Sequence, residues 1–214
     1  METLSIVSIL LLTAAAAAPS PDGVCVACRA DLAQIRVDYS VDEWTTLTRG
    51  EIVTTNARTA TAGGSTHGDV NTAAIVSYTP TQVWSVLTDF EARPRFIPTM
   101  RESHITRTER NRTWVAEWLR VLWVNVHLQV IDTLDPEAGT IRWVLDKNAK
   151  HDITDTIGSW QIAAVSEGRT YAGYRNWVDT GRPVPYFVEN LLTQHTLPKV
   201  IEGLQAELVR RYGD

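Results

Sequence analysis

One stretch of the chain carries apolar residues at the three- and four-residue spacing of an amphipathic helix. Its apolar stripe consists of Val83, Val86, Leu87 and Phe90. Thr79 and Gln82 form a capping box at the start of this helix, and Pro80 suits its first position. Because a residue before proline avoids the helical conformation, we expect the helix to end at Arg93, before Pro94.

On both sides of this helix the apolar period shortens to two residues, which predicts β-strands. Two strands are expected before it, at residues 51–61 and 69–78, joined by the loop TAGGSTHGD. Three hairpins are expected after it, from residues 101–108 with 113–123, 124–134 with 140–147, and 156–165 with 170–179.

A long helical tail is expected over residues 184–212, where Pro198 should kink or restart the helix. The apolar stripe of its second half consists of Leu197, Val200, Ile201, Leu204 and Leu208. An apolar sheet face must be covered, and only this helix is long enough to cover it. The pattern predicts an α+β fold. A curved antiparallel sheet of about six to seven strands grips a long C-terminal helix, beside a short helix pair, and a cavity separates sheet and helix.

Residues 1–17 combine an apolar run with an alanine tract, which is typical of a secretory signal peptide cleaved after Ala17. The alternative is an apolar helix that is kept as an anchor. Residues 18–49 then predict a tether with a short helix, opened by a capping box of Ser40 and Glu43. Residues 50–214 form the main domain. We therefore expect a protein that is exported to the periplasm or secreted.

The composition is that of an ordinary soluble domain, with 44% hydrophobic and 21% charged residues. A net charge of -5 and the lack of any nucleic-acid motif argue against nucleic acid as a partner. Eight tryptophans exceed the roughly three expected at this length. Tryptophan is favoured at half-wet surfaces and against flat ligands. The five histidines show no metal-ligand spacing, so we expect no metal and no cofactor.

Cys25 and Cys28 are the only cysteines, spaced C-x-x-C. A haem attachment would need histidine after the second cysteine, where Arg29 stands, and a zinc site would need a second pair of ligands. In an oxidising compartment the expected product is a local disulfide between Cys25 and Cys28. A redox-active dithiol is the alternative.

The run GDVNTAAIVSYTPTQVWSVLTDFEARPRFIPTMRES, with GSWQI and VPYFVENLLTQHTLPKVIEGLQ, resembles the START-like superfamily. Within it, the chain is most similar to the polyketide cyclase/dehydrase and coenzyme Q-binding type, over about residues 50–212. The resemblance implies a helix-grip fold around an apolar pocket for lipids, sterols, quinones or aromatic polyketides. Some members are cyclases or dehydratases, and many only bind. Trp123 departs from the pattern, because relatives often carry glycine there.

Strand alternation and this resemblance together predict the side chains that face the pocket. The expected ligand-binding residues are Phe96, Ile97, Glu117, Leu119, Leu128, Trp143, Trp160, Tyr174, Asn176, Phe187, Val188, Leu191 and His195. The inward orientation of Glu117, Tyr174 and Asn176 is implied by the resemblance. Phe96 and Ile97, held between Pro94 and Pro98, are expected to form a gate over the pocket with Phe187 and Val188; a closed corner of the core is the alternative.

Glu117 is the expected carboxylate in the apolar wall, and burial without a partner would be costly. It should therefore be paired or have a raised pKa. Three roles remain open: an ion pair with an arginine at the pocket mouth, a hydrogen bond to a ligand, or a general acid.

These features predict a monomeric carrier that binds or sequesters a hydrophobic small molecule outside the cytoplasm, with transient membrane contact. The alternative is a cyclase or dehydratase with Glu117 as acid/base and Asn176 or Tyr174 polarising a carbonyl. A third class is a partner-binding module whose docking surface comprises the outward-facing Trp114, Trp118 and Trp177.

Overall fold

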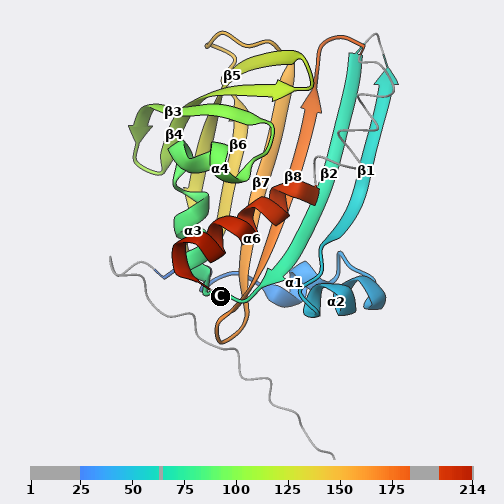
Figure 1. Ribbon diagram of the computed structural model, residues 1–214, viewed down its shortest axis with the longest axis vertical. Helices are drawn as coiled ribbons and strands as arrows, with labels where there is room; N and C mark the ends of the chain where they lie inside the picture. The colour runs from blue at the N-terminus through green and yellow to red at the C-terminus, as the bar shows by residue number, and fades with distance from the viewer. Residues whose placement is uncertain (1–24, 63–64, 184–197, 214) are drawn as a thin grey trace, which may run out of the picture.

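The protein is described by a computed structural model, which covers residues 25–62, 65–183 and 198–213. Its strands form one antiparallel sheet in the order β1-β2-β8-β7-β6-β5-β4-β3 (Figure 1). The strands are β1 (Val53–Ala62), β2 (Ser65–Val76), β3 (Met100–Glu109), β4 (Arg112–Val121), β5 (Val124–Asp135), β6 (Thr140–Leu145), β7 (Asp155–Ser166) and β8 (Arg169–Asp179). The predicted α+β helix-grip fold is confirmed, with eight strands where about six to seven were expected.

The connection from β2 to β3 crosses the sheet from one edge region to the other. It consists of α3 (Pro80–Leu87), the 3-10 helix η1 (Phe90–Ala92) and α4 (Arg93–Phe96). Helix α3 begins with the predicted capping box, because the Gln82 backbone N–H donates to Thr79 Oγ1 and the Gln82 side chain accepts from the Thr79 N–H. This crossover places α4 over the inner face of the sheet (Figure 1).

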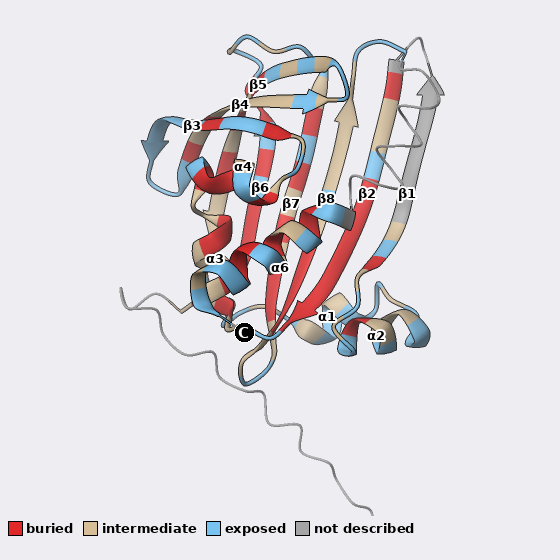
Figure 2. Cartoon of the chain, in the orientation of Figure 1, coloured by how far each residue is buried: buried red, intermediate tan, exposed pale blue. Residues whose placement is uncertain are grey.

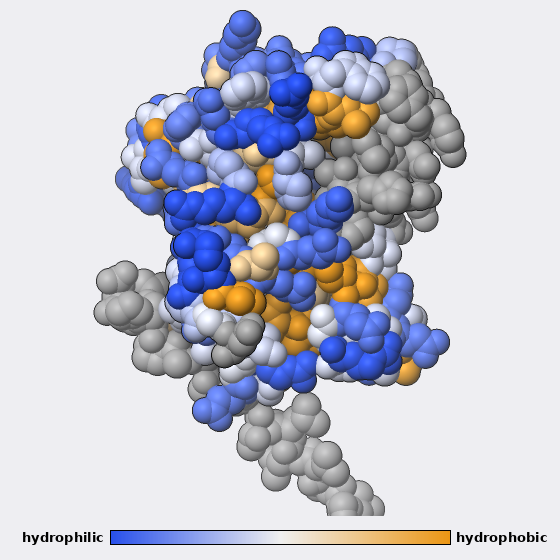
Figure 3. Space-filling view, in the orientation of Figure 1, coloured by the Kyte–Doolittle hydropathy of each residue, from blue (hydrophilic) through white to orange (hydrophobic). Residues whose placement is uncertain are grey.

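The C-terminal helix α6 (Pro198–Tyr212) lies across the concave face and contacts α3, α4 and β2 (Figure 1). Its predicted stripe of Val200, Ile201, Leu204 and Leu208 is buried in the main core. Gly203 allows close approach to α4, since a Cβ there would overlap the carbonyl oxygen of Phe96. Buried residues occur on α6 and on the strands that it crosses (Figure 2). Apolar side chains that remain visible on this side gather along and below α6 (Figure 3).

Two short helices, α1 (Leu32–Arg36) and α2 (Val41–Thr48), pack against the opposite face. Leu47 of α2 is fully buried there with Ile75 and Tyr171 in a second, smaller core. The predicted capping box of Ser40 and Glu43 is present at the start of α2. From residue 25 onward, the region expected to be a tether is packed against the sheet, with Val26 and Ala27 in the main core and Leu47 in the smaller one.

The predicted end of the first helix is wrong, because α3 ends at Leu87 and not at Arg93. The Thr88 hydroxyl donates to the carbonyl oxygen of Trp84 at 2.9 Å, a local bond that competes with helix continuation. Pro94 then stands in the first turn of α4, where its missing N–H costs nothing. Proline thus starts a helix here instead of stopping one.

The predicted TAGGSTHGD loop is also too long, because β2 already begins at Ser65, opposite Ala62. The expected signal peptide over residues 1–17 and the first half of the tail helix, residues 184–197, lie outside the described residues. Helix α6 covers Pro198–Tyr212, so the predicted kink or restart at Pro198 lies at the border of the described residues and stays a prediction. None of the helices described is long and apolar enough to cross a membrane.

The expected disulfide is not formed, and Cys25 and Cys28 are free thiols. The Cys28 thiol donates to the carbonyl oxygen of Cys25 at 3.6 Å. The turn between them has Ala27 in the left-handed region, with φ 59°, and its N–H donates to the Pro136 carbonyl at 2.7 Å. This turn holds the two thiols side by side, and the hydrogen bond with the Cys28 side chain raises the pKa of Cys25.

A buried carboxylate ties α6 to the crossover. Glu207, whose side chain is 3% exposed, accepts hydrogen bonds from Arg210 at 2.6 Å and Arg211 at 2.7 Å. Arg211 also bonds Asp89 at 2.6 Å, just after α3. The bond from Arg210, and then that from Arg211, lower the pKa of Glu207 from 4.5 to about 2, against the opposing effect of burial.

Because the pKa of Glu207 is lower in the folded state, its charge stabilises the fold above pH 4.5. That stability is lost as the pH falls from 4.5 to about 2. We expect Glu207→Gln to lower the free energy of unfolding at pH 7 by about 2 kcal/mol and to flatten its slope in this window. Urea titrations from pH 7 downward test this, with Glu202→Gln, exposed on the same helix, as control. Equal effects of both substitutions would contradict the prediction.

Candidate functional site

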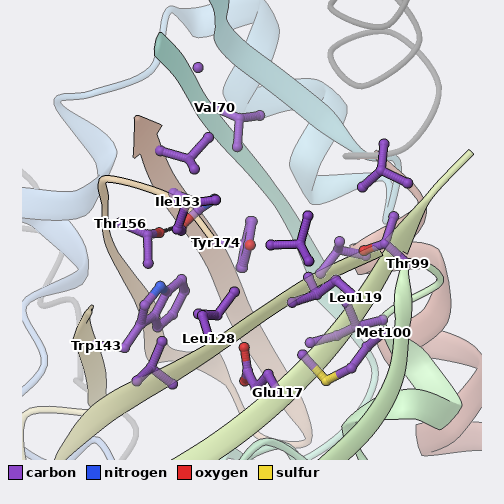
Figure 4. A pocket seen from close by; sticks show the side chains of 18 of the residues that line it. Val70, Thr99, Met100, Glu117, Leu119, Leu128, Trp143, Ile153, Thr156 and Tyr174 are labelled. Carbon is purple, nitrogen blue, oxygen red and sulfur yellow. Dashed lines mark hydrogen bonds between the residues drawn. The ribbon is translucent and has the colours of Figure 1, made fainter. Parts of the chain in front are cut away.

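A cavity of about 260 Å³ lies between the concave face of the sheet and the α4 and α6 helices. Its walls are mostly apolar, as the close view of the labelled residues shows (Figure 4). Strand alternation creates this wall, because every second side chain of β4, β5 and β8 points inward. On β5 the inward residues Val126, Leu128 and Val130 all line the cavity.

The structure brings most of the predicted site residues together. Those that line the cavity are Ile97, Glu117, Leu119, Leu128, Trp143, Trp160, Tyr174 and Asn176. Phe187, Val188, Leu191 and His195 lie outside the described residues. Two of the four predicted gate residues, Phe96 and Ile97, are described. The prediction is wrong for Phe96, which is 2% exposed in the main core and does not line the cavity. The backbone carbonyl of Phe96 lies against Gly203 of α6, while Ile97, at the end of α4, lines the cavity.

Three aromatic rings form one wall of the cavity. The ring centroids of Trp143 and Tyr174 are 5.6 Å apart, and those of Tyr174 and Trp160 are 4.9 Å apart. Gly158, opposite Trp143 in the sheet, makes room for this wall, since a Cβ there would overlap the indole. Figure 4 shows Tyr174 pointing into the middle of the cavity. Its hydroxyl makes no hydrogen bond to any residue in the described part of the chain.

A buried arginine bridges two carboxylates at the floor of the cavity. Arg93 Nη1 donates to Glu117 Oε1 at 2.5 Å, and Arg93 Nη2 donates to Asp132 Oδ1 at 2.6 Å. The three side chains are 7%, 9% and 0% exposed, in the order Arg93, Glu117 and Asp132. The guanidinium also lies 4.5 Å from the centroid of the Phe90 ring. Of the three open roles of Glu117, the ion pair is present, but it is buried and not at the mouth.

Sequence reasoning missed Arg93 and Asp132. Asp132 follows Val126, Leu128 and Val130 at inward positions of β5. A charged residue in this apolar series could have been recognised from the sequence as a buried carboxylate. Nothing in the local sequence marks Arg93 as buried, because it reaches the sheet only through the path of the connection between β2 and β3.

The pKa values of Glu117, Asp132 and Tyr174 are all raised. Burial raises the pKa of Glu117 against the opposing effect of Arg93, and it raises the pKa of Asp132 in the same way. Burial and the nearby Glu117 also raise the pKa of Tyr174, which stays a neutral phenol. Asp132 Oδ2 and Ser103 Oγ are buried without a hydrogen-bond partner among the described residues. One cation thus faces two carboxyls in a place from which water is largely excluded.

The tryptophans expected to form a docking surface do not lie together. Trp114 and Trp118 belong to β4 and Trp177 to β8, with three strands between them. Each is half-buried and covered by a neighbour. Arg107 lies over Trp114 at 4.5 Å, and His127 and His67 stack on Trp118 and Trp177 at 5.8 Å and 5.9 Å. Across the described ranges, no cluster of His, Cys, Asp and Glu is arranged to hold a metal ion.

Comparison with known proteins gives one family match. A family model described as polyketide cyclase/dehydrase and lipid transport matches residues 67–213. No sequence among the curated proteins matches the chain significantly.

Solved structures with the same fold share little sequence identity with the chain. The Zhui aromatase/cyclase from Streptomyces sp. R1128 is 16% identical with a TM-score of 0.58, over 68% of this chain and 95% of that one. A START superfamily protein from Mycobacterium smegmatis is 17% identical with a TM-score of 0.57, over 67% and 98%. A STAR-related lipid transfer protein from Xanthomonas axonopodis is 13% identical with a TM-score of 0.55, over 72% and 99%. At these identities the likeness concerns the fold.

Removing the buried cation should unfold the protein readily. Arg93→Met leaves Glu117 and Asp132 buried without a counter-charge, so we expect a loss of about 3–5 kcal/mol in the free energy of unfolding. Chemical denaturation at pH 7 measures this loss. Arg95→Met, on the same helix turn and 59% exposed, is the matched control and should cost less than about 1 kcal/mol. A similar loss in both variants would show that the bridge contributes nothing specific.

Proposed function

The chain belongs to the polyketide cyclase/dehydrase and lipid transport family, and we propose on that basis that it binds and carries a hydrophobic small molecule. The observation that carries this proposal is the apolar cavity between the sheet, α4 and α6. Burial of an apolar ligand there would gain roughly 25 cal/mol per Å² of apolar surface removed from water. The cavity volume, about 260 Å³, is close to the lower end of the roughly 300–1,000 Å³ typical of ligand pockets.

The polar groups in the cavity suggest which hydrophobe fits. The Tyr174 hydroxyl points into the space, and Glu117 lies at its floor with one oxygen held by Arg93 (Figure 4). On the far wall Thr156 donates to Asn176 Oδ1 at 3.2 Å. A compact ligand with one hydroxyl or carbonyl, such as a sterol, quinone or single-chain lipid, would pair its polar end with these groups.

The pairing of Glu117 favours binding over turnover. A general base must release and take up a proton within reach of its substrate. Here the guanidinium of Arg93 holds one oxygen of Glu117 at 2.5 Å and Asp132 at 2.6 Å, which fits a structural role for the carboxylate. The same groups would still orient a ligand by hydrogen bonding.

We further propose that the carrier works outside the cytoplasm and touches membranes transiently. The apolar run of residues 1–17 supports export. Leu122 and Trp123, 38% and 66% exposed, form the turn between β4 and β5, next to Val121 of the cavity wall. An exposed tryptophan next to a residue of the cavity wall suits the interface of a neutral bilayer, where a ligand would be loaded.

A second candidate function is a cyclase or dehydratase. It is favoured by the raised pKa of Glu117 together with the neutral Tyr174 phenol in the same cavity. In this case Glu117 would act as acid/base, and Tyr174 or Asn176 would polarise a carbonyl of an aromatic polyketide-like substrate.

Filling the cavity should abolish ligand retention. We expect native mass spectrometry of protein from its own host to show a bound small molecule in the wild type and none in Leu128→Trp, because the indole occupies the cavity. Asn125→Trp, exposed on the outer face of the same strand, is the matched control and should retain the molecule. The same spectra test export, which predicts a mature chain beginning at Ala18. Full retention by Leu128→Trp would contradict the proposed pocket.

Neutralising the carboxylate separates the two candidate functions. Under the carrier proposal, Glu117→Gln keeps the bound molecule within a few-fold of the wild-type stoichiometry, and neither protein converts an aromatic polyketide-like substrate. An acid/base enzyme would instead convert it, and Glu117→Gln would reduce that turnover by about 10²–10⁴-fold. Product formation followed by liquid chromatography decides between them, with the exposed Glu91→Gln as control for the charge change.

A further inference from the structure

A second hollow, of about 360 Å³, lies on the outer face of the sheet beside α1. It is built by β6, β7, β8 and β2, the strands whose inner faces enclose the apolar cavity. Its lining is polar and includes Arg142, Ser159, Arg175 and Asn71. Alternation separates the two sites: Arg142 stands between the buried Ile141 and Trp143, and Arg175 directly follows Tyr174.

The sheet register places these four residues in one row. Arg142 is opposite Ser159, Ser159 is opposite Arg175, and Arg175 is opposite Asn71. Residues directly opposite in antiparallel strands share a face, and neighbouring strands are about 4.8 Å apart. The Cα atoms of the two arginines are therefore roughly 10 Å apart with a serine hydroxyl between them. Both guanidinium groups can reach a single small molecule at Ser159.

The donors of this row are not used within the protein. Neither Arg142 nor Arg175 forms an ion pair with a carboxylate in the described ranges, whereas Arg29, Arg93 and Arg211 each do. The side-chain amide of Asn71 also has no hydrogen-bond partner in that same part of the chain, and its atoms are open to the hollow. It can therefore donate to an accepting ligand there.

The charge of the hollow is positive. Asp38 is the one carboxylate among the described residues that line it, against two guanidinium groups. Gln161 is already committed, because its amide donates to the Ala138 carbonyl at 3.1 Å. Two forked cationic donors, a hydroxyl and an amide around one point match the several acceptor oxygens of a phosphate group.

We propose that this row of Arg142, Ser159, Arg175 and Asn71 is a binding site for a phosphate group, carried by a soluble phosphate monoester or by a phospholipid headgroup. The site is independent of the apolar cavity and of the function proposed for it. Arginine holds phosphate in a bidentate manner, so both guanidinium groups contribute directly.

Isothermal titration calorimetry of the purified full chain with glycerol 3-phosphate tests the soluble source, at about 0.15 M salt to screen non-specific attraction. Co-sedimentation with phosphatidylcholine vesicles, with and without phosphatidic acid, tests the headgroup source. We expect saturable binding in at least one arm. Arg142→Gln/Arg175→Gln should weaken it on the order of 100-fold, since it removes two charge-assisted contacts.

Two further variants make the test specific. Arg101→Gln/Arg112→Gln removes the same charge from exposed positions of β3 and β4 and should leave the affinity unchanged. Asp38→Asn should tighten binding several-fold, because it removes the carboxylate that opposes the anion. The variants change exposed residues, and thermal melts check that each remains folded. No binding in either arm, or an equal loss in the control variant, would overturn the proposal.

Discussion

The buried guanidinium of Arg93 is the interaction on which the rest of the site depends. It joins the crossover helix α4 to the two strands next to the edge strand β3, through Glu117 on β4 and Asp132 on β5. Charges in such a place are tolerated only when they are paired and hydrogen-bonded. The position of α4, and with it one wall of the cavity, therefore follows from where these three groups can meet.

This constraint explains why a cavity persists beneath the helices. A curved sheet cannot be filled by straight helices, and α6 approaches α4 as closely as Gly203 allows. Phe96 is buried in the main core and does not line the cavity. The floor is polar and the walls are apolar, which gives a bound hydrophobe a defined orientation.

The same strands serve two surfaces of different chemistry. Inward positions of β6, β7 and β8 supply Trp143, Trp160 and Tyr174, while outward positions supply Arg142, Ser159 and Arg175. Side chains of a strand alternate between the two faces of the sheet, so the inward and outward residues are separated by the strand itself. A register shift of one residue would exchange the two faces. The polar row is thus as firmly placed by the register as the aromatic wall is.

Residues close together in the chain were enough to predict the local elements and the inward face of the strands. Capping boxes such as that of Thr79 and Gln82, the hairpins, and the alternation around Leu128 depend on residues close in the chain. Even so, local signals misled at Pro94, which starts a helix turn, and at Cys28, whose sulfur meets a backbone oxygen. Tertiary structure alone decided that Arg93 meets Glu117 and Asp132, which lie 24 and 39 residues away, and that Arg142 and Arg175 share one row. The physical reason is that such partners are chosen by strand register and crossover path, and these minimise buried unpaired charge over the whole molecule.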